Sequence, residues 1–224
     1  MTRPARVAIA AGGAFVLLSL AVWQRLAGVA AVDTAVHTWV ITTRSESTIV
    51  VARAVTEAGS TFVAIPLILL LGLIALAGRP AAVRIGGAVL LTAVTSLGAA
   101  LGLAVNAAIN GVRPGEASWA GAAGGPTFPS GHTTVATLLA ASVAWAAWIR
   151  TTDPRVRTAA VIVAVAIAAV VGVSRVWLGV HWPSDVLGGW LYGLAWAGFA
   201  IVAVDQVRRQ RRPVRATADD RIRA

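Results

Sequence analysis

Apolar residues occur in long runs along this chain, and polar residues gather between them. Six runs reach or approach the length needed to cross a bilayer, which is about 20 mostly apolar residues. They are residues 7–26, 62–77, 85–105, 133–149, 158–173 and 186–204. Because the bilayer core offers the backbone no water, such runs satisfy their hydrogen bonds as helices. The pattern predicts an all-α fold, an integral-membrane bundle of six helices.

Composition supports a membrane protein and excludes two other classes. Hydrophobic residues make up 58% of the 224 residues and charged residues 12%, where about 25% is usual in soluble domains. The mean hydropathy of +0.78 is too high for a disordered chain and too high for a soluble domain of this size. We expect a single transmembrane domain over residues 1–204 and a basic, disordered cytoplasmic tail over residues 205–224.

The arginines predict how the bundle is oriented. All 19 basic residues are arginine, and fourteen of them fall on one side of the predicted bundle. That side carries Arg3, Arg6, Arg79, Arg84, Arg150, Arg155, Arg157 and the seven tail arginines from Arg208 to Arg223; the other carries Arg25, Arg44, Arg53, Arg113 and Arg175. Since positive charge favours the cytoplasmic side, both termini are expected in the cytoplasm of a multi-pass cell-membrane protein. Connections 106–129 and 174–185 then face outside.

The net charge of +10 and the lack of cysteine narrow the chemistry. A basic chain can bind nucleic acid, but these arginines lie beside apolar runs, so we expect membrane rather than nucleic acid as the partner. Without cysteine the chain has no disulfide, no thiolate metal ligand and no cysteine nucleophile.

The first predicted span and the connection after it each allow two interpretations. Basic residues, an apolar run and the small residues Gly28 to Ala30 also fit a cleaved signal peptide. The next connection carries Val32, Val36, Trp39 and Val40 at helical spacing. This pattern predicts an amphipathic helix on the outer membrane surface, with guidance of a lipid substrate as the alternative role.

Two glycine pairs are spaced four residues apart inside predicted spans. They are Gly98 with Gly102 and Gly189 with Gly193. Small residues at this spacing let helices approach closely in a membrane, so we expect both pairs to lie at helix contacts.

The two outer connections hold an unusual set of polar residues for so apolar a chain. The first runs from Asn106 through Arg113-Pro114 to Phe128-Pro129-Ser130-Gly131-His132. The second is Ser174-Arg175, then His181 and Asp185. Ionisable groups are costly at membrane depth, so such a cluster indicates function.

These side chains suit phosphate chemistry. Arg113 and Arg175 can clamp a tetrahedral oxyanion. Ser130 and Gly131 open a predicted helix, where free N–H groups favour an anion. Asp185 follows His181 by four residues, so its carboxylate can fix the imidazole tautomer and leave the other nitrogen as a nucleophile. His132 can carry a proton to a leaving oxygen.

The chain resembles the type 2 phosphatidic acid phosphatase (PAP2) superfamily, with its pattern K-x6-R-P, P-S-G-H and S-R-x5-H-x3-D. The second and third motifs are complete here, and Arg113-Pro114 matches the end of the first. The family's lysine falls at Asn106, and the chain contains no lysine to replace it. This departure puts the strength of phosphate binding in doubt.

The resemblance implies a membrane-bound lipid phosphate phosphatase that needs no metal or cofactor. His181 would attack phosphorus and form a phosphohistidine, Asp185 would orient it, and His132 would act as acid and then base. The expected phosphate ligands are Arg113, Arg175, Ser130, Gly131 and Asn106. The expected substrate is a polyprenyl diphosphate, phosphatidic acid or phosphatidylglycerol phosphate at the outer leaflet.

Several alternatives remain at this stage. The arginines taken alone also suit interfacial anchors, and Ser130 and Asp185 suit helix caps. His132, His181 and Asp185 form a possible zinc ligand set, although two arginines at the site would repel a cation. Asn106 raises the possibility of a weak or inactive lipid-phosphate-binding pseudoenzyme. A transporter is the other alternative, but the paired, interrupted helices common in transporters are not evident.

Overall fold

The computed structural model describes residues 2–210, and this part of the chain is built from helices joined by turns and loops. The elements are α1 (Arg3–Trp23), α2 (Ala27–Thr43), α3 (Glu46–Thr56), η1 (Glu57–Gly59), α4 (Thr61–Ala75), α5 (Ala81–Ile109), η2 (Glu116–Ser118), α6 (Gly131–Arg150), α7 (Pro154–Trp177) and α8 (Pro183–Gln210). The predicted all-α architecture is confirmed.

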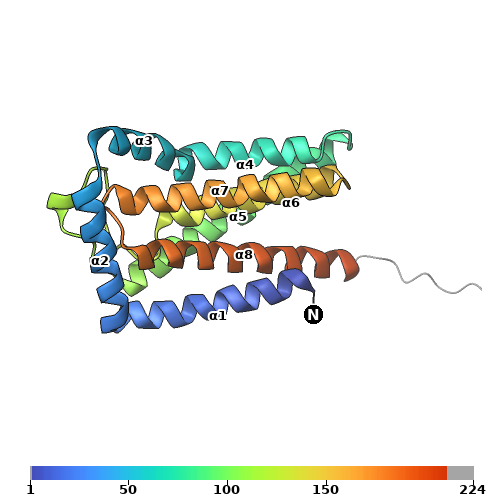
Figure 1. Ribbon diagram of the computed structural model, residues 1–224. Helices are drawn as coiled ribbons and strands as arrows, with labels where there is room; N and C mark the ends of the chain where they lie inside the picture. The colour runs from blue at the N-terminus through green and yellow to red at the C-terminus, as the bar shows by residue number, and fades with distance from the viewer. Residues whose placement is uncertain (1, 211–224) are drawn as a thin grey trace, which may run out of the picture.

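The long helices lie side by side, and α2 crosses one end of the bundle (Figure 1). Helix α6 is the most enclosed of them, with every residue from Thr133 to Ala140 buried. It packs against α4, α7 and α8. Because α6 begins at Gly131, its first turn lies where these neighbours meet.

Five of the six predicted spans correspond to single helices long and apolar enough to cross a membrane. The helix ends differ from the prediction by a few residues, because the helices continue into the polar residues that flank the apolar runs. Helix α7, for example, begins directly after Asp153, which caps it by accepting the N–H of Arg155 at 2.8 Å. The predicted span 62–77 is different, since α4 meets the span criterion only together with α3 and η1, at a bend of 51°. Length and composition therefore allow one bent span that begins with α3, earlier than the predicted start at residue 62.

The predicted amphipathic helix is confirmed as α2, but its buried face differs from the predicted stripe. Val40 is buried and Val36 half-buried, whereas Val32 and Trp39 are exposed at 59% and 57%. Asp33 is buried with them at 8% exposure. The inward face therefore includes a carboxylate that periodicity alone does not place there.

Both glycine pairs lie at helix contacts, as predicted. A Cβ on Gly189 would stand 2.8 Å from the Cβ of Thr133, and one on Gly193 would stand 2.7 Å from that of Thr137, so α8 approaches α6 at glycine. A Cβ on Gly98 would stand 2.5 Å from the indole of Trp196, so α5 makes room there for an aromatic ring of α8.

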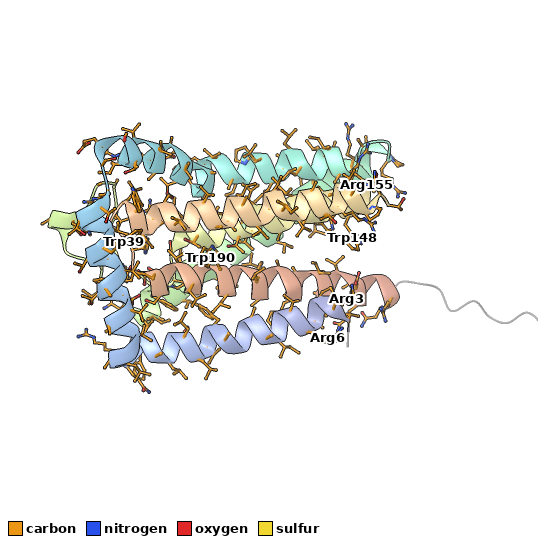
Figure 2. The ribbon with its side chains drawn as sticks, viewed as in Figure 1. Arg3, Arg6, Trp39, Trp148, Arg155 and Trp190 are labelled. Carbon is orange, nitrogen blue, oxygen red and sulfur yellow. The ribbon has the colours of Figure 1, made fainter. Side chains whose placement is uncertain are left out.

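The two ends of the bundle carry different residues. We call the end crossed by α2 the site end. Arg3, Arg6 and Arg155 lie at the opposite end, where α8 finishes (Figure 2). Large apolar side chains point outward between the ends; Leu17, for instance, is 70% exposed and Val165 62%. Such outward apolar surface suits contact with lipid, and the chain is a multi-pass membrane protein.

The C-terminal tail is described only in part. Helix α8 continues to Gln210, so the tail expected from residue 205 is helical over its first six residues, where disorder was expected. Helix α8 continues through residues 205–210 because this segment contains no glycine or proline, the residues that commonly end a helix. Residues 211–224, with five of the seven tail arginines, lie outside the described part.

Candidate active site

Three segments far apart in the sequence meet at the site end. They are the loop between α5 and α6, the first turn of α6, and the turn between α7 and α8 (Figure 1). The N–H of Ser130 donates to the carbonyl of Asp185 at 3.0 Å. Nη1 of Arg113 donates to the carbonyl of Val180 at 2.7 Å. The structure thus brings the three motifs together, as the sequence predicts.

His181 and Asp185 form a buried pair in the α7–α8 turn and the first turn of α8. The two side chains are 3% and 0% exposed, and Nδ1 of His181 lies 3.2 Å from Oδ2 of Asp185. Arginine only donates hydrogen bonds, and Nη1 of Arg113 lies 3.1 Å from Nε2 of His181. The lone pair is therefore assigned to Nε2 and the proton to Nδ1, which faces Asp185. Burial lowers the pKa of His181 below its usual value; the contact with Asp185 opposes this shift, and the charges of Arg113 and Arg175 add to it.

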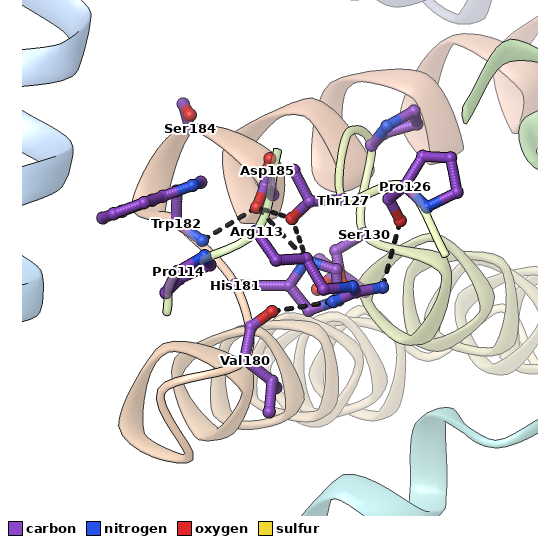
Figure 3. A network of polar contacts seen from close by, with 12 residues as sticks. Arg113, Pro114, Pro126, Thr127, Ser130, Val180, His181, Trp182, Ser184 and Asp185 are labelled. Atoms are coloured by element: carbon purple, nitrogen blue, oxygen red, sulfur yellow. Dashed lines mark hydrogen bonds and ion pairs between the residues drawn. The ribbon is translucent and has the colours of Figure 1, made fainter. Parts of the chain in front are cut away.

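Thr127 completes this pair, although no sequence feature pointed to it. Its hydroxyl is buried, donates to Oδ2 of Asp185, and lies 3.1 Å from Nδ1 of His181 (Figure 3). The N–H of Trp182 donates to the same Oδ2 at 2.8 Å. The carboxylate is therefore held by groups from two segments of the chain while it faces the imidazole.

Arg113 lies on the other side of the imidazole. Its Nε and Nη2 donate to the three consecutive carbonyls of residues 124–126 at 2.9–3.0 Å. Its Nη1 lies 3.1 Å from Nε2 of His181 (Figure 3). Burial lowers the pKa of Arg113, and the charge of Asp185 opposes the shift. The guanidinium therefore links the loop before α6 to the histidine.

Arg175 contributes a second buried guanidinium from the last turn of α7. It is 4% exposed, and its Nη1 donates to Oγ1 of Thr56 at 3.1 Å. Its Nε has no hydrogen-bond partner among the described residues. Because a buried charge is costly unless paired, this arginine is suited to receive an anionic group.

The first turn of α6 lies beside these residues. Ser130 is fully buried, and its Oγ accepts from Oγ1 of Thr133 at 3.0 Å. Gly131 and His132 follow it and begin the helix, so their N–H groups have no acceptor within α6. His132 is near enough to Arg113, Arg175 and His181 to interact with their charges.

Comparison with known proteins identifies a family that this chain resembles. The sequence model of the PAP2 superfamily matches residues 105–209. The structure also matches the crystal structure of a transmembrane PAP2-type phosphatidylglycerolphosphate phosphatase from Bacillus subtilis. That match has a TM-score of 0.76 and 25% identity, and covers 90% of this chain and 96% of the other. Residues 105–209 of this chain belong to the PAP2 superfamily.

A curated relative of this PAP2 protein matches over a shorter region. An undecaprenyl-diphosphatase from Sulfolobus acidocaldarius is 37% identical over 84 residues, which cover 35% of this chain and 34% of the relative. The match thus spans about a third of that relative's length.

Asn106, which stands at the position of the family's lysine, makes different contacts from those expected. Its Nδ2 donates to the carbonyls of Pro126 and Pro129, both at 3.2 Å. Both amide hydrogens therefore hold the loop that leads into α6 and do not point to an open phosphate position. In this PAP2 protein the residue braces the loop that carries Thr127 and Ser130.

Thr56 and Thr127 were missed by the sequence analysis for the same reason. Thr56 lies 119 residues from its partner Arg175, and Thr127 lies 58 residues from Asp185. The partner of each threonine is too far away in the sequence for any spacing between the two residues to predict the contact. Only Phe128 separates Thr127 from the P-S-G-H motif, but closeness to a motif does not assign a residue a role.

The zinc interpretation has a separate geometric test. Within residues 2–210, no three histidine, cysteine, aspartate or glutamate side chains are grouped as a metal site would require. Oδ2 of Asp185 is instead engaged by Thr127 and by the N–H of Trp182. The residues of this site fit an anion better than a cation.

Proposed function

We propose that this PAP2 protein is an integral-membrane phosphatase that hydrolyses a phosphomonoester or diphosphate of a lipid without a metal ion. The observation that carries the proposal is the buried imidazole of His181 placed between Asp185 and Arg113. Arg175, whose Nε has no hydrogen-bond partner within residues 2–210, supplies a second cation beside it. The names of the relatives favour a polyprenyl diphosphate or phosphatidylglycerol phosphate, and phosphatidic acid is the third candidate.

In the first proposed step, Nε2 of His181 attacks phosphorus and the bond from phosphorus to the leaving oxygen breaks. Asp185 keeps the proton on Nδ1, so the lone pair stays on Nε2 and the charge that forms on the ring is stabilised. His132 donates its proton to the leaving oxygen. The products are a phosphohistidine and the dephosphorylated lipid.

In the second step, His132 acts as a base. It takes a proton from water, the water oxygen attacks phosphorus, and the bond from phosphorus to Nε2 breaks. Inorganic phosphate is released and His181 returns to its starting state. One group serves as acid and then as base, so the site is ready for the next lipid.

The charge that develops on the phosphoryl oxygens needs fixed donors. We propose that Arg113, Arg175, the hydroxyl of Ser130 and the N–H of Gly131 supply them. Arg113 has to leave Nε2 of His181 for this purpose, because a donor on the lone pair blocks attack. The negative phosphate is the group that draws the guanidinium away.

We further propose that the site faces outside the cell and that both termini are cytoplasmic. Arg3, Arg6 and Arg155 lie at the end opposite the site (Figure 2), and positive charge favours the cytoplasmic side. Since the chain has no cysteine, Ala122→Cys near the site and Thr152→Cys at the other end each introduce one labelling position. An impermeant maleimide should label only Ala122→Cys in intact cells; labelling of Thr152→Cys alone would reverse the orientation.

The decisive experiment is phosphate release from the three lipids by purified protein in detergent with a chelator present. We expect activity on at least one lipid, a trapped acid-labile phosphoenzyme, and loss of both in His181→Ala. Arg175→Ala should lose activity, while Arg155→Ala, at the opposite end, should keep it. Activity lost on chelation would contradict metal independence, and activity retained in His181→Ala would contradict the nucleophile.

Asn106 favours a second candidate, a lipid-phosphate-binding protein with weak or no catalysis. Its neutral amide is committed to two carbonyls, so one cation of the family's site is missing. This candidate predicts phosphate binding without phosphoenzyme. Asn106→Lys should raise phosphate affinity, and unchanged or poorer kinetics would show that the asparagine is specialised.

A further inference from the structure

The residue just before helix α8 has no side-chain acceptor to offer the first turn of the helix. The first N–H groups of a helix have no acceptor within it, and a polar residue just before the helix usually supplies one. Here that residue is Trp182, whose indole can only donate. Its Nε1 donates to the carbonyl of Val112 at 2.8 Å. The N–H of Ser184, the second residue of α8, therefore needs an acceptor from elsewhere.

Asp33, on the crossing helix α2, supplies that acceptor. Its Oδ1 accepts the N–H of Ser184 at 2.9 Å, and its Oδ2 accepts the hydroxyl of Ser184 at 2.6 Å. Asp33 and Ser184 are 8% and 7% exposed. A buried carboxylate is costly unless hydrogen-bonded, so the two bonds explain why Asp33 is tolerated inside.

The other half of the cap is local. Oδ2 of Asp185 accepts the N–H of Trp182 at 2.8 Å, as the third residue of a capping box does. The same oxygen lies 3.2 Å from Nδ1 of His181. Two carboxylates, one from α2 and one from α8, therefore hold the turn that sets the distance between His181 and Asp185.

Helix α2 contacts the residues on both sides of Ser184 in the sequence. Val40 packs with Val176 of α7 and Val186 of α8. The ring of His37 lies 5.1 Å from the ring of Trp182. These contacts fix α2 across the end of the bundle where α8 begins (Figure 1), so Asp33 has a fixed position relative to Ser184.

We propose that Asp33 is a positioning residue of this PAP2 protein: it caps α8 from α2 and thereby holds His181 and Asp185 in the arrangement that the reaction needs. Asp33 acts through Ser184 and does not touch the substrate. The kinetic part of this inference rests on the proposed phosphatase function, and the structural part does not.

The test compares Asp33→Ala with Asp33→Asn in the full-length protein, using whichever lipid phosphate is hydrolysed. Because small misplacements of reacting groups cost up to about a hundredfold in rate, Asp33→Ala should lower kcat by about tenfold to a hundredfold with KM unchanged. Asp33→Asn should keep kcat within about threefold, since its amide can accept from the N–H of Ser184 and donate to the hydroxyl.

Asp153→Ala is the matched control, because Asp153 caps α7 at the opposite end of the bundle. Both variants remove a helix cap, but Asp153→Ala should leave kcat unchanged. An equal loss of kcat in both variants would overturn the proposal, because it would reflect stability alone. A loss in Asp33→Asn as large as in Asp33→Ala would also overturn it, since the charge and not the cap would then matter.

Amide hydrogen exchange gives a readout that does not depend on activity. Asp33→Ala should speed exchange in the first turn of α8, around Ser184, and Asp153→Ala should speed it only at the start of α7. Unchanged exchange at Ser184 would overturn the cap. Inactive wild-type protein with the expected exchange pattern would instead overturn the proposed function. If Asp33→Ala does not fold, Asp33→Leu replaces it, because leucine has a similar branched shape but no acceptor for Ser184. Wild-type kcat in that variant would overturn the proposal.

Discussion

Nη1 of Arg113 lies 3.1 Å from Nε2 of His181, the ring nitrogen that Asp185 leaves without a proton. The same guanidinium is bonded to the carbonyls of residues 124–126. In the mechanism proposed here, this arrangement means that Arg113 holds the nucleophile and the loop in place until phosphate arrives. The arginine then changes partners, from a lone pair on nitrogen to the oxygens of the substrate.

Arg113→Lys should lower kcat/KM by about a hundredfold, because an ammonium is a point charge that lacks the planar fork of donors. One lysine cannot reach three consecutive carbonyls and the imidazole together. Steady-state kinetics on the preferred lipid phosphate measures the effect, with Arg155→Lys at the opposite end as the control. Near wild-type kcat/KM in Arg113→Lys would show that positive charge alone is sufficient.

Thr127→Val should lower kcat by about tenfold or more, whereas Thr127→Ser should retain most of it. Valine has nearly the shape of threonine but cannot donate to Asp185, so the buried carboxylate loses a hydrogen bond worth about 1.5–3 kcal/mol. Serine keeps the hydroxyl. Rates of phosphoenzyme formation in the two variants compare the effects directly. Equal rates would mean that the bond from Thr127 is not needed for the reaction.

The activity should persist on the acid side of neutrality. Attack requires neutral His181, and burial lowers the pKa of this imidazole. A lowered pKa keeps the neutral form populated as pH falls through 6.5, the usual value for histidine. The acid limb of the kcat/KM profile should therefore lie below pH 6.5. Asp185→Asn should move it lower still, because the carboxylate raises this pKa; a limb above 6.5 would contradict the assignment.

Gly189→Ala should destabilise the bundle, and Gly86→Ala should not. A Cβ at Gly189 would stand 2.8 Å from the Cβ of Thr133 and 2.9 Å from the carbonyl oxygen of Ser130, whereas one at Gly86 has open space. Overpacking costs about 1–3 kcal/mol, while alanine in a helix gains up to about 1 kcal/mol over glycine. Thermal unfolding in detergent should separate the two variants in opposite directions. A neutral Gly189→Ala would show that α6 and α8 can move apart at little cost.

Spacing within one turn explains why much of the candidate site could be predicted. His181 and Asp185 are four residues apart, so their contact follows from local geometry alone. Arg113, Ser130 and Arg175 were assigned by motif, and the fold brings their segments together. The contacts of Asn106 were not predictable, because the carbonyls of Pro126 and Pro129 that it meets belong to a loop of irregular shape. Thr56 and Thr127 were missed because each serves a partner more than 50 residues away.

The second span shows the limit of apolar patterning for the fold. The run 62–77 was found, but α3 carries polar positions such as Glu46 and Arg53, so apolar run length did not include it in the span. In the structure it continues α4 across a bend of 51°, because its apolar side packs on α7. The position of α3 is decided by a helix that is distant in the sequence, so the local pattern of apolar residues does not predict it.

Apolar run length and motif spacing are properties of neighbouring residues, and for that reason the amino-acid order alone was enough to establish a helical membrane bundle, the two ends of unequal charge, and the residues gathered at one of them. The partners of Arg113, the cap that Asp33 places on α8, and the buried position of Thr127 came only from the folded chain. The contact of Arg113 with Val180 joins residues 67 positions apart, that of Thr127 with Asp185 joins residues 58 apart, and that of Asp33 with Ser184 joins residues 151 apart. Such contacts depend on how whole helices pack, and packing is set by every helix together.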